Sequence, residues 1–139
     1  MPLYQSAETA STAHWGRATW TFLFRLAAAF PHAKECERDV PLSAREVAFL
    51  RARFRSLLLA LADLVPCPVC QRHFVAYLRR HSLDRALEDR ESLLSFLHAA
   101  KQAVNHRLGK RGISRATARR RHVPPCAEQI KSGRTSKQR

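Results

Sequence analysis

The sequence predicts an all-α protein, a four-helix bundle with a short fifth helix. Ala, Leu and Arg abound among the 139 residues, β-branched residues are sparse, and only four glycines occur. This balance favours helix. Apolar residues also recur at steps of three and four along several stretches, which is the spacing of one helical face. Four such stretches joined by short links predict an antiparallel bundle.

The first predicted helix begins at Trp15 and ends near Phe30, because Pro31 cannot continue it. Its core-facing side chains are expected to be Trp15, Thr19, Phe22, Leu23, Leu26 and Phe30. A loop with Cys36 follows over residues 31–42.

The second predicted helix covers residues 44–64 and has the clearest amphipathic pattern in the chain. Ser43 and Glu46 have the spacing of a capping box, in which each side chain bonds the other residue's backbone N–H. The apolar stripe comprises Val47, Leu50, Phe54, Leu57, Leu58, Leu61 and Leu64. Its strength would also allow dimerisation.

The third predicted helix follows Pro66 and extends to about Arg80, and residues 81–90 form a polar connection. A fourth helix is expected over residues 91–108, where Gly109 has the position of a C-cap glycine. A short fifth helix is possible near 114–121. No segment of the sequence has the pattern of a β-strand or of an internal repeat.

Three parts of the chain are expected to differ in order. Residues 1–13 form a flexible N-terminus, residues 14–121 the helical domain, and residues 122–139 a basic, disordered tail. The formal charge is +14, and residues 101–139 carry 12 Lys/Arg against one acid, Glu128. Such a tail could contact nucleic acid or an anionic surface, or could simply aid solubility.

No apolar run is long enough to span a bilayer, and no signal peptide is visible. We therefore expect an intracellular protein. Four cysteines are too few for a small secreted domain stapled by disulfides. One close pair and two singles indicate redox chemistry or a metal site instead.

The close pair, Cys67 and Cys70, carries the strongest chemical signal. Pro68 lies between the cysteines, and proline is favoured at the first helical position. Cys67 is therefore expected to cap a helix, with Cys70 in its first turn. Backbone N–H groups and the helix dipole favour thiolate over thiol there, which makes a cysteine pair reactive.

Two alternatives explain a cysteine pair in other ways. A zinc site could take Cys67, Cys70, His73 and His81, although structural zinc usually takes two separated ligand pairs. A thioredoxin-like site also places the pair at a helix start, but it needs a strand just before the pair. Here a long capped helix precedes it.

A third interpretation comes from ordered blocks over residues 14–113. The segment His14-Trp15-Gly16-Arg17-Ala18-Thr19-Trp20 resembles the first-helix motif of the Erv/ALR family of FAD-linked sulfhydryl oxidases. The family's Pro-Cys-x-x-Cys and His-Phe correspond to residues 66–70 and 73–74, and its later helix corresponds to Phe96-Leu97, Val104-Asn105 and Leu108-Gly109-Lys110. The length resembles compact members from large DNA viruses, which would place the protein in host cytoplasm or a virion.

The resemblance implies a thiol oxidase that forms disulfides in client proteins. Substrate thiolate would attack Cys67, the more exposed sulfur, and Cys70 would leave as thiolate stabilised by the helix start. Electrons would pass from the pair to FAD and then to O₂, giving hydrogen peroxide. Cofactor contacts are expected from Gly16, Arg17, Trp20, His73, Lys101, Val104, Asn105 and Lys110, and no metal is expected.

Several positions depart from the family pattern. Phe24 replaces a histidine, Phe30 a tyrosine, and Lys101-Gln102 a His-Asn pair, all of which face the flavin nucleotide in the family. His98 and Arg115 replace the cysteines of a common disulfide staple.

Partners follow from the same resemblance. We expect thiol-containing clients, O₂ as acceptor and a homodimer. Cys36 and Cys126 could pair with each other, cross-link a dimer or stay reduced. Two alternatives stay open: a basic helical protein that binds nucleic acid or zinc, and a flavin-less relative that only exchanges disulfides or serves as a scaffold.

Overall fold

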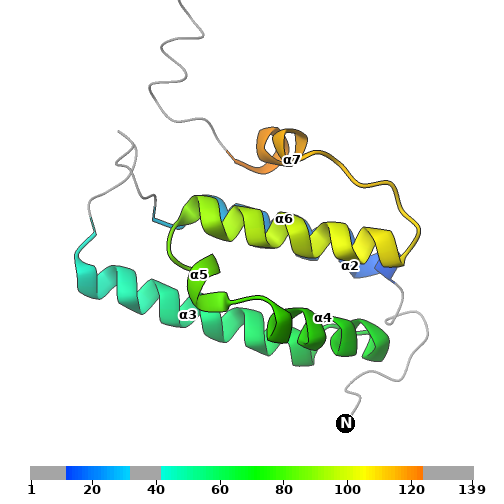
Figure 1. The fold of residues 1–139 in the computed structure, drawn as a ribbon, viewed down its shortest axis with the longest axis horizontal. Helices are drawn as coiled ribbons and strands as arrows, with labels where there is room; N and C mark the ends of the chain where they lie inside the picture. The colour runs from blue at the N-terminus through cyan, green and yellow to red at the C-terminus, as the bar shows by residue number, and fades with distance from the viewer. Residues whose placement is uncertain (1–11, 32–41, 124–139) are drawn as a thin grey trace, which may run out of the picture.

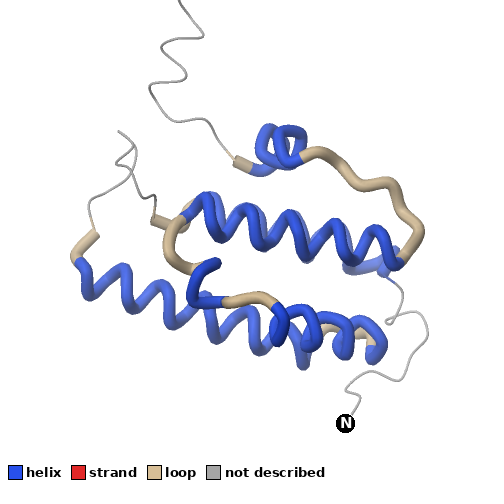
Figure 2. Tube along the Cα trace, viewed as in Figure 1, coloured by secondary structure: helices blue, strands red, loops and turns tan. Residues whose placement is uncertain are grey.

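The computed structural model describes residues 12–31 and 42–123, and all regular structure in these ranges is helical. Four longer helices and two short ones follow one another along the chain (Figures 1 and 2). They are α2 (Thr12–Ala28), α3 (Ala44–Leu64), α4 (Pro68–Arg80), α5 (Leu83–Ala86), α6 (Arg90–Arg107) and α7 (Arg115–His122). The predicted all-α bundle is confirmed.

The helices pack in two pairs. α2 lies along α6, α3 lies along α4, and α7 crosses the outside of α2 and α6 (Figure 1). The core between the pairs is built from fully buried side chains, of which Leu58, Leu93 and Leu97 are the largest. Edge-on rings join the layers, because Phe30 contacts Phe54 with centroids 5.7 Å apart.

Local sequence signals set most helix ends. The Ser43 side chain accepts a hydrogen bond from the Glu46 N–H while the Glu46 carboxylate accepts one from the Ser43 N–H, so the predicted capping box is confirmed. Asp89 caps α6 through a single side-chain bond, accepting from the Ser92 N–H at 2.8 Å. Gly109 adopts φ 66°, the left-handed conformation in which helices commonly end.

The buried face of α2 differs from the prediction. Phe22 was expected in the core but is 58% exposed, whereas Phe24, which lay outside the predicted stripe, is 2% exposed. The reason is packing: α2 meets both α6 and α7, and this turns Leu23, Phe24 and Ala27 inward. A helical stripe gives the spacing of the buried face and leaves its rotation uncertain by one side chain.

The stripe of α3 is also wider than its buried face. Phe54 and Leu58 are buried as predicted, but Leu50 and Leu64 remain largely exposed. The reason is that α3 has one main neighbour, α4, so only part of its apolar surface is covered.

The predicted polar connection 81–90 contains a short helix, α5. Ser82 caps it, accepting from the Arg85 N–H at 3.3 Å, and Leu83 and Ala86 bury their side chains. The prediction that residues 81–90 form a connection without regular structure was therefore wrong. Two apolar side chains that face the core are sufficient to stabilise one helical turn here.

Polar contacts tie α7 to α6 where the family's disulfide staple would stand. The His98 imidazole Nε2 lies 3.0 Å from the Ile113 carbonyl oxygen, and the Gln102 amide also donates to that oxygen. Arg115 donates to the Ser95 hydroxyl. Arg119 pairs with both carboxylate oxygens of Glu91. Hydrogen bonds and an ion pair thus hold α7 and the loop before it against α6.

In the described ranges, no helix combines the length and apolarity that crossing a bilayer requires. Cys36, Cys126 and most of the predicted N-terminal and tail segments lie outside the described residues. α2 begins at Thr12 and α7 ends at His122.

Candidate active site

The cysteine pair lies at the start of α4, as predicted. Cys67 is the N-cap, Pro68 occupies the first turn, and the two cysteines form a disulfide. The Cys70 N–H donates to the Cys67 sulfur over 3.2 Å. The hydrogen bond from the helix start therefore reaches Cys67, although the sequence had assigned it to Cys70.

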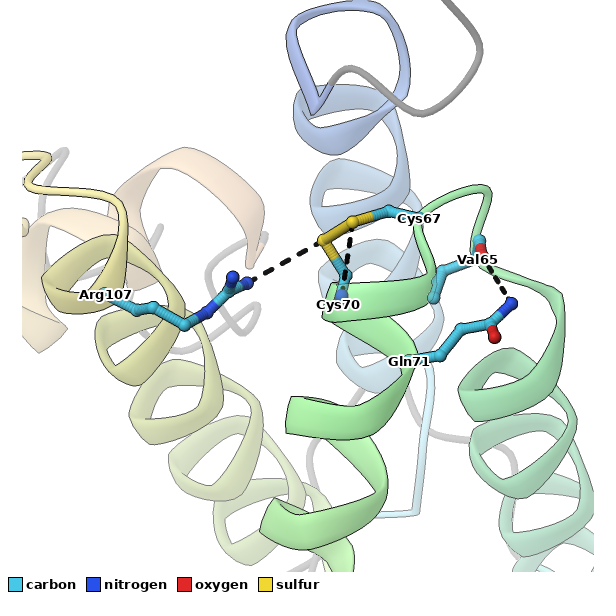
Figure 3. Close-up of a disulfide and its surroundings, with 5 residues drawn as sticks. All are labelled: Val65, Cys67, Cys70, Gln71 and Arg107. Carbon is cyan, nitrogen blue, oxygen red and sulfur yellow. Dashed lines mark hydrogen bonds between the residues drawn. A yellow bond between two sulfur atoms is a disulfide. The ribbon is translucent and has the colours of Figure 1, made fainter. Parts of the chain in front are cut away.

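The turn before the disulfide is held by one amide side chain. The Gln71 Nε2 donates to the Asp63 carbonyl oxygen over 2.9 Å. It also donates to the Val65 carbonyl oxygen over 3.0 Å (Figure 3). The Cys67 N–H also donates to the Val65 carbonyl, over 2.7 Å. These bonds hold the end of α3 against the first turn of α4, and they thereby fix the position of the disulfide.

The two sulfurs differ in access. Cys70 is buried and Cys67 is half-buried, which confirms Cys67 as the more exposed member. Val69, between them, is 45% exposed, and Leu64 at the end of α3 is 48% exposed. An incoming thiol therefore meets Cys67 first, beside an apolar rim.

A cation approaches the buried sulfur from another helix. Arg107, in the last turn of α6, donates from Nη2 to the Cys70 sulfur over 3.8 Å (Figure 3). Arg107 was not predicted as a site residue from the sequence. No local pattern marks it, because the contact joins residues 37 positions apart in the chain.

A second cluster combines aromatic rings and cations where α2, α6 and α7 meet. The Phe24 ring stacks on His122, with centroids 4.8 Å apart, and the Lys101 ammonium lies 5.8 Å from the Phe24 centroid. Burial, then Arg121 and Arg17, lowers the pKa of Lys101. Repulsion of this kind means that the cluster favours an anion.

His122 has the same surroundings. Burial, then Lys101, Arg25 and Arg121, lowers its pKa, so the ring tends to be neutral. Its Nδ1 is buried and, among the described residues, has no hydrogen-bond partner. A buried polar atom without a partner is costly and rare, so a missing ligand is a physical explanation.

The comparisons with known proteins agree with this geometry. The profile of the Erv1/Alr family matches residues 17–123. The chain belongs to the Erv1/Alr family.

Named relatives come from a virus and a fungus. Protein 096R of Invertebrate iridescent virus 3, whose name describes it as an FAD-linked sulfhydryl oxidase, is 31% identical over 112 residues. The match covers 80% of this chain and 67% of the relative. The mitochondrial FAD-linked sulfhydryl oxidase erv1 of Schizosaccharomyces pombe is 30% identical over 98 residues, 70% of this chain. The chain spans 47% of that fungal protein.

Solved structures show the same fold. The yeast Erv1 core has a TM-score of 0.65 at 21% identity and covers 88% of this chain and 92% of that one. The FAD-binding domain of Erv1 from Saccharomyces cerevisiae has a TM-score of 0.61 at 23% identity, with 77% and 89% covered. These likenesses establish the Erv1-type bundle.

Within this family member, the predicted cofactor residues occupy several places. Arg17 and Lys101 belong to the cluster at α2, α6 and α7, and Trp20 contacts Phe24 there, with centroids 6.4 Å apart. Gly16, Val104 and Asn105 are half-buried, while His73 and Lys110 are exposed. The structure thus brings together Arg17, Trp20 and Lys101, and the roles of all eight stay predictions.

Two substituted family positions have structural roles here. Phe30 is buried against Phe54, and Gln102 bonds Ile113 and His98. The fit of FAD therefore rests on the remaining groups. The orphaned Nδ1 of His122 and the cations around it suit an anionic aromatic dinucleotide.

Neither described cavity is lined by the predicted cofactor residues. One, of about 170 Å³, lies between α6 and α7 and is bounded by Phe24, Glu91, Leu94, His98, Arg115, Ala116, Ala118, Arg119 and Val123. A wider groove, of about 680 Å³, runs beside α3, α4 and α5. The zinc alternative is not favoured, because both pair cysteines are committed to the disulfide.

Proposed function

We propose that this protein is an FAD-linked sulfhydryl oxidase that forms disulfide bonds in client proteins. The observation that carries the proposal is a disulfide at the start of α4, with one accessible and one buried sulfur, inside an Erv1/Alr-type bundle. The names of the viral and fungal relatives support the enzyme class and the cofactor. Thiols are the substrates such an oxidase needs.

The chain's own residues supply the disulfide exchange. A client thiolate attacks the Cys67 sulfur, a client–Cys67 bond forms, and the Cys67–Cys70 bond breaks. Cys70 keeps the bonding electrons as a thiolate. A second client thiolate then attacks the client sulfur and releases the Cys67 thiolate. The client has lost two electrons and two protons, and the pair has gained the electrons.

FAD, when bound, would take these two electrons and pass them to O₂, giving hydrogen peroxide. The residues proposed to hold it are Gly16, Arg17, Trp20, His73, Lys101, Val104, Asn105 and Lys110. Arg17 and Lys101 would neutralise the dinucleotide phosphates. Phe24 and His122 join this proposal, because their stacked rings lie inside the same cationic cluster.

The proposal also covers the domain boundaries, the oligomeric state and the location of the protein. Residues 14–121 form the oxidase domain, as predicted from the sequence, and His122, the last residue of α7, packs with that domain. The rest of the predicted 122–139 tail touches nucleic acid or an anionic surface in this proposal. Phe22 and Phe49, both more than half exposed, support a homodimer through α2 and α3. An intracellular site, in host cytoplasm or a virion, is supported by the viral relative.

Three measurements test the function. Purified protein should be yellow with absorbance near 450 nm, should consume O₂ with dithiothreitol, and should lose turnover in Cys70→Ala. Cys36→Ala, which removes a cysteine outside the pair, is the control and should retain turnover with this small substrate. Colourless protein that consumes no O₂, or a Cys70→Ala variant with full turnover, would contradict the proposal.

A further inference from the structure

The contact between Arg107 and the Cys70 sulfur is unusual in its chemistry. A guanidinium is always charged and is well suited to holding an anion, but a disulfide sulfur carries no charge. Among the residues that the structure describes, no carboxylate pairs with Arg107. The side chain is half-buried and crosses from α6 toward α4 (Figure 3). Its charge is therefore matched only when Cys70 becomes a thiolate.

We propose that Arg107 is a further catalytic residue, which stabilises the Cys70 thiolate and thereby makes Cys70 the leaving group. The inference rests on the proposed thiol oxidation. When a client thiolate attacks Cys67, the Cys67–Cys70 bond breaks and its electron pair moves to the Cys70 sulfur. The negative charge that began on the client ends beside the guanidinium, so no other reactant is needed.

The two sulfurs are distinguished by their donors. Cys67 accepts one neutral backbone N–H, from Cys70 over 3.2 Å, while Cys70 accepts a charged donor over 3.8 Å. Burial of Cys70 would raise the pKa of its thiol, and the cation opposes that cost. Access favours attack at Cys67, and charge favours departure of Cys70. Both asymmetries give the same direction of reaction.

The arginine should also set the redox balance of the pair. A cation beside the thiolate stabilises the reduced form, which makes the disulfide a stronger oxidant of clients. Arg107→Gln should therefore shift the equilibrium with glutathione toward the disulfide by about tenfold, or about 30 mV more negative. The same change should raise the pKa of the Cys70 thiol by about 1.

The test measures thiol reactivity directly. In the Cys67→Ser background, alkylation of Cys70 by iodoacetamide is followed by mass spectrometry from pH 5 to 10. Compared with the protein that retains Arg107, Arg107→Gln should shift the Cys70 titration to higher pH. The alkylation rate of Cys70 at pH 7 should fall by up to about tenfold. Arg107→Lys should retain most of the effect, since it keeps the charge. Circular dichroism checks that each variant is folded.

Arg72→Gln is the matched control. Arg72 lies two residues after Cys70 on α4, is exposed and carries the same charge, yet does not contact the sulfur. Its removal should change the pKa of the Cys70 thiol much less. Equal shifts in Arg72→Gln and Arg107→Gln would overturn the inference, because the effect would then be net charge alone.

Two more outcomes decide the question. A Cys70 pKa with Arg107 present at or above that of a free thiol, about 8.5, would overturn the inference whatever the variants do. If Arg107→Gln retains the pKa of Cys70 and the glutathione equilibrium, Arg107 has no such role while the oxidase assignment stands. If purified protein lacks flavin and O₂ consumption, the oxidase assignment fails although the thiol titration still reports on Arg107.

Discussion

The Phe24 ring lies flat against the His122 imidazole, with an interplanar angle of 12°. Both rings are buried, and they come from α2 and α7. The stack therefore fastens α7 to α2, and it lies among the cations Lys101, Arg25 and Arg121. Its stability must depend on whether the imidazole is charged.

We predict that acid weakens the fold through His122. Its pKa is lowered from about 6.5 in the folded protein, so between the two pKa values the unfolded chain binds more protons. The free energy of unfolding should have its full value above pH 6.5, where His122 is neutral in both states. It should decrease as the pH falls below 6.5. Urea unfolding at pH 7.5 and 5.5 measures this, and His122→Phe should reduce the difference.

His106→Gln is the control for that experiment, because His106 is exposed. It should leave the pH dependence unchanged. Glu46 acts in a lower pH range, since bonds from Ser43 lower its pKa from 4.5. An equal loss at pH 5.5 in the protein with His122 and in His122→Phe would refute the assignment.

Lys101→Met should separate cofactor binding from folding. Neighbouring Arg121 and Arg17 repel the Lys101 ammonium, so its removal should not lower the melting temperature of flavin-free protein. Loss of a charged contact to a phosphate should weaken FAD binding about tenfold. The absorbance ratio at 450 and 280 nm and a melting curve measure the two effects.

Arg45→Met, which removes an exposed charge from the first turn of α3, is the matched variant. It should change neither flavin content nor melting. Normal FAD content in Lys101→Met would remove Lys101 from the proposed cofactor site.

Gly112→Ala should act through one neighbour. A Cβ at position 112 would overlap the Gln102 carboxamide, which donates to the Ile113 carbonyl. Displacing that amide should lower the free energy of unfolding by about 1 kcal/mol. In the Gln102→Ala background the same substitution should cost far less, because the obstructing group is gone. Equal costs in both backgrounds would show that the loop itself, and not Gln102, requires glycine.

Leu58 and Leu59 are neighbours on α3 with opposite surroundings, since Leu58 is fully buried and Leu59 is 45% exposed. Leu58→Ala should lower the free energy of unfolding by about 2–5 kcal/mol through cavity formation. Leu59→Ala should change it by less than about 0.5 kcal/mol. Urea denaturation compares them, and a large loss in Leu59→Ala would mean that the exposed face of α3 is covered in solution, as a homodimer requires.

Local signals allowed much of this fold to be predicted. The capping box at Ser43, the proline after Cys67 and the glycine at 109 act within a few residues, so their effects can be read from the chain itself. Partners across the bundle could not be predicted. Arg107 and Cys70 are 37 residues apart, and only the packing of α6 near α4 brings them together.

The same limit applies to the aromatic pair. Phe24 lay outside the expected apolar stripe and His122 lay in a predicted tail, yet each buries the other. Their pairing depends on how α2 rotates and where α7 lands. Neither quantity is fixed by periodicity or charge.

The unequal burial of the two sulfurs determines which thiol donors can react with each of them. A thiol on a folded client protein can reach only the Cys67 sulfur, so every exchange with such a client begins there. The Cys70 sulfur then serves only to pass electrons toward the interior. A small reductant that slips past the Val69 rim could strike the Cys70 sulfur instead. Shape alone would then restrict large donors to the Cys67 sulfur while leaving both sulfurs open to small ones.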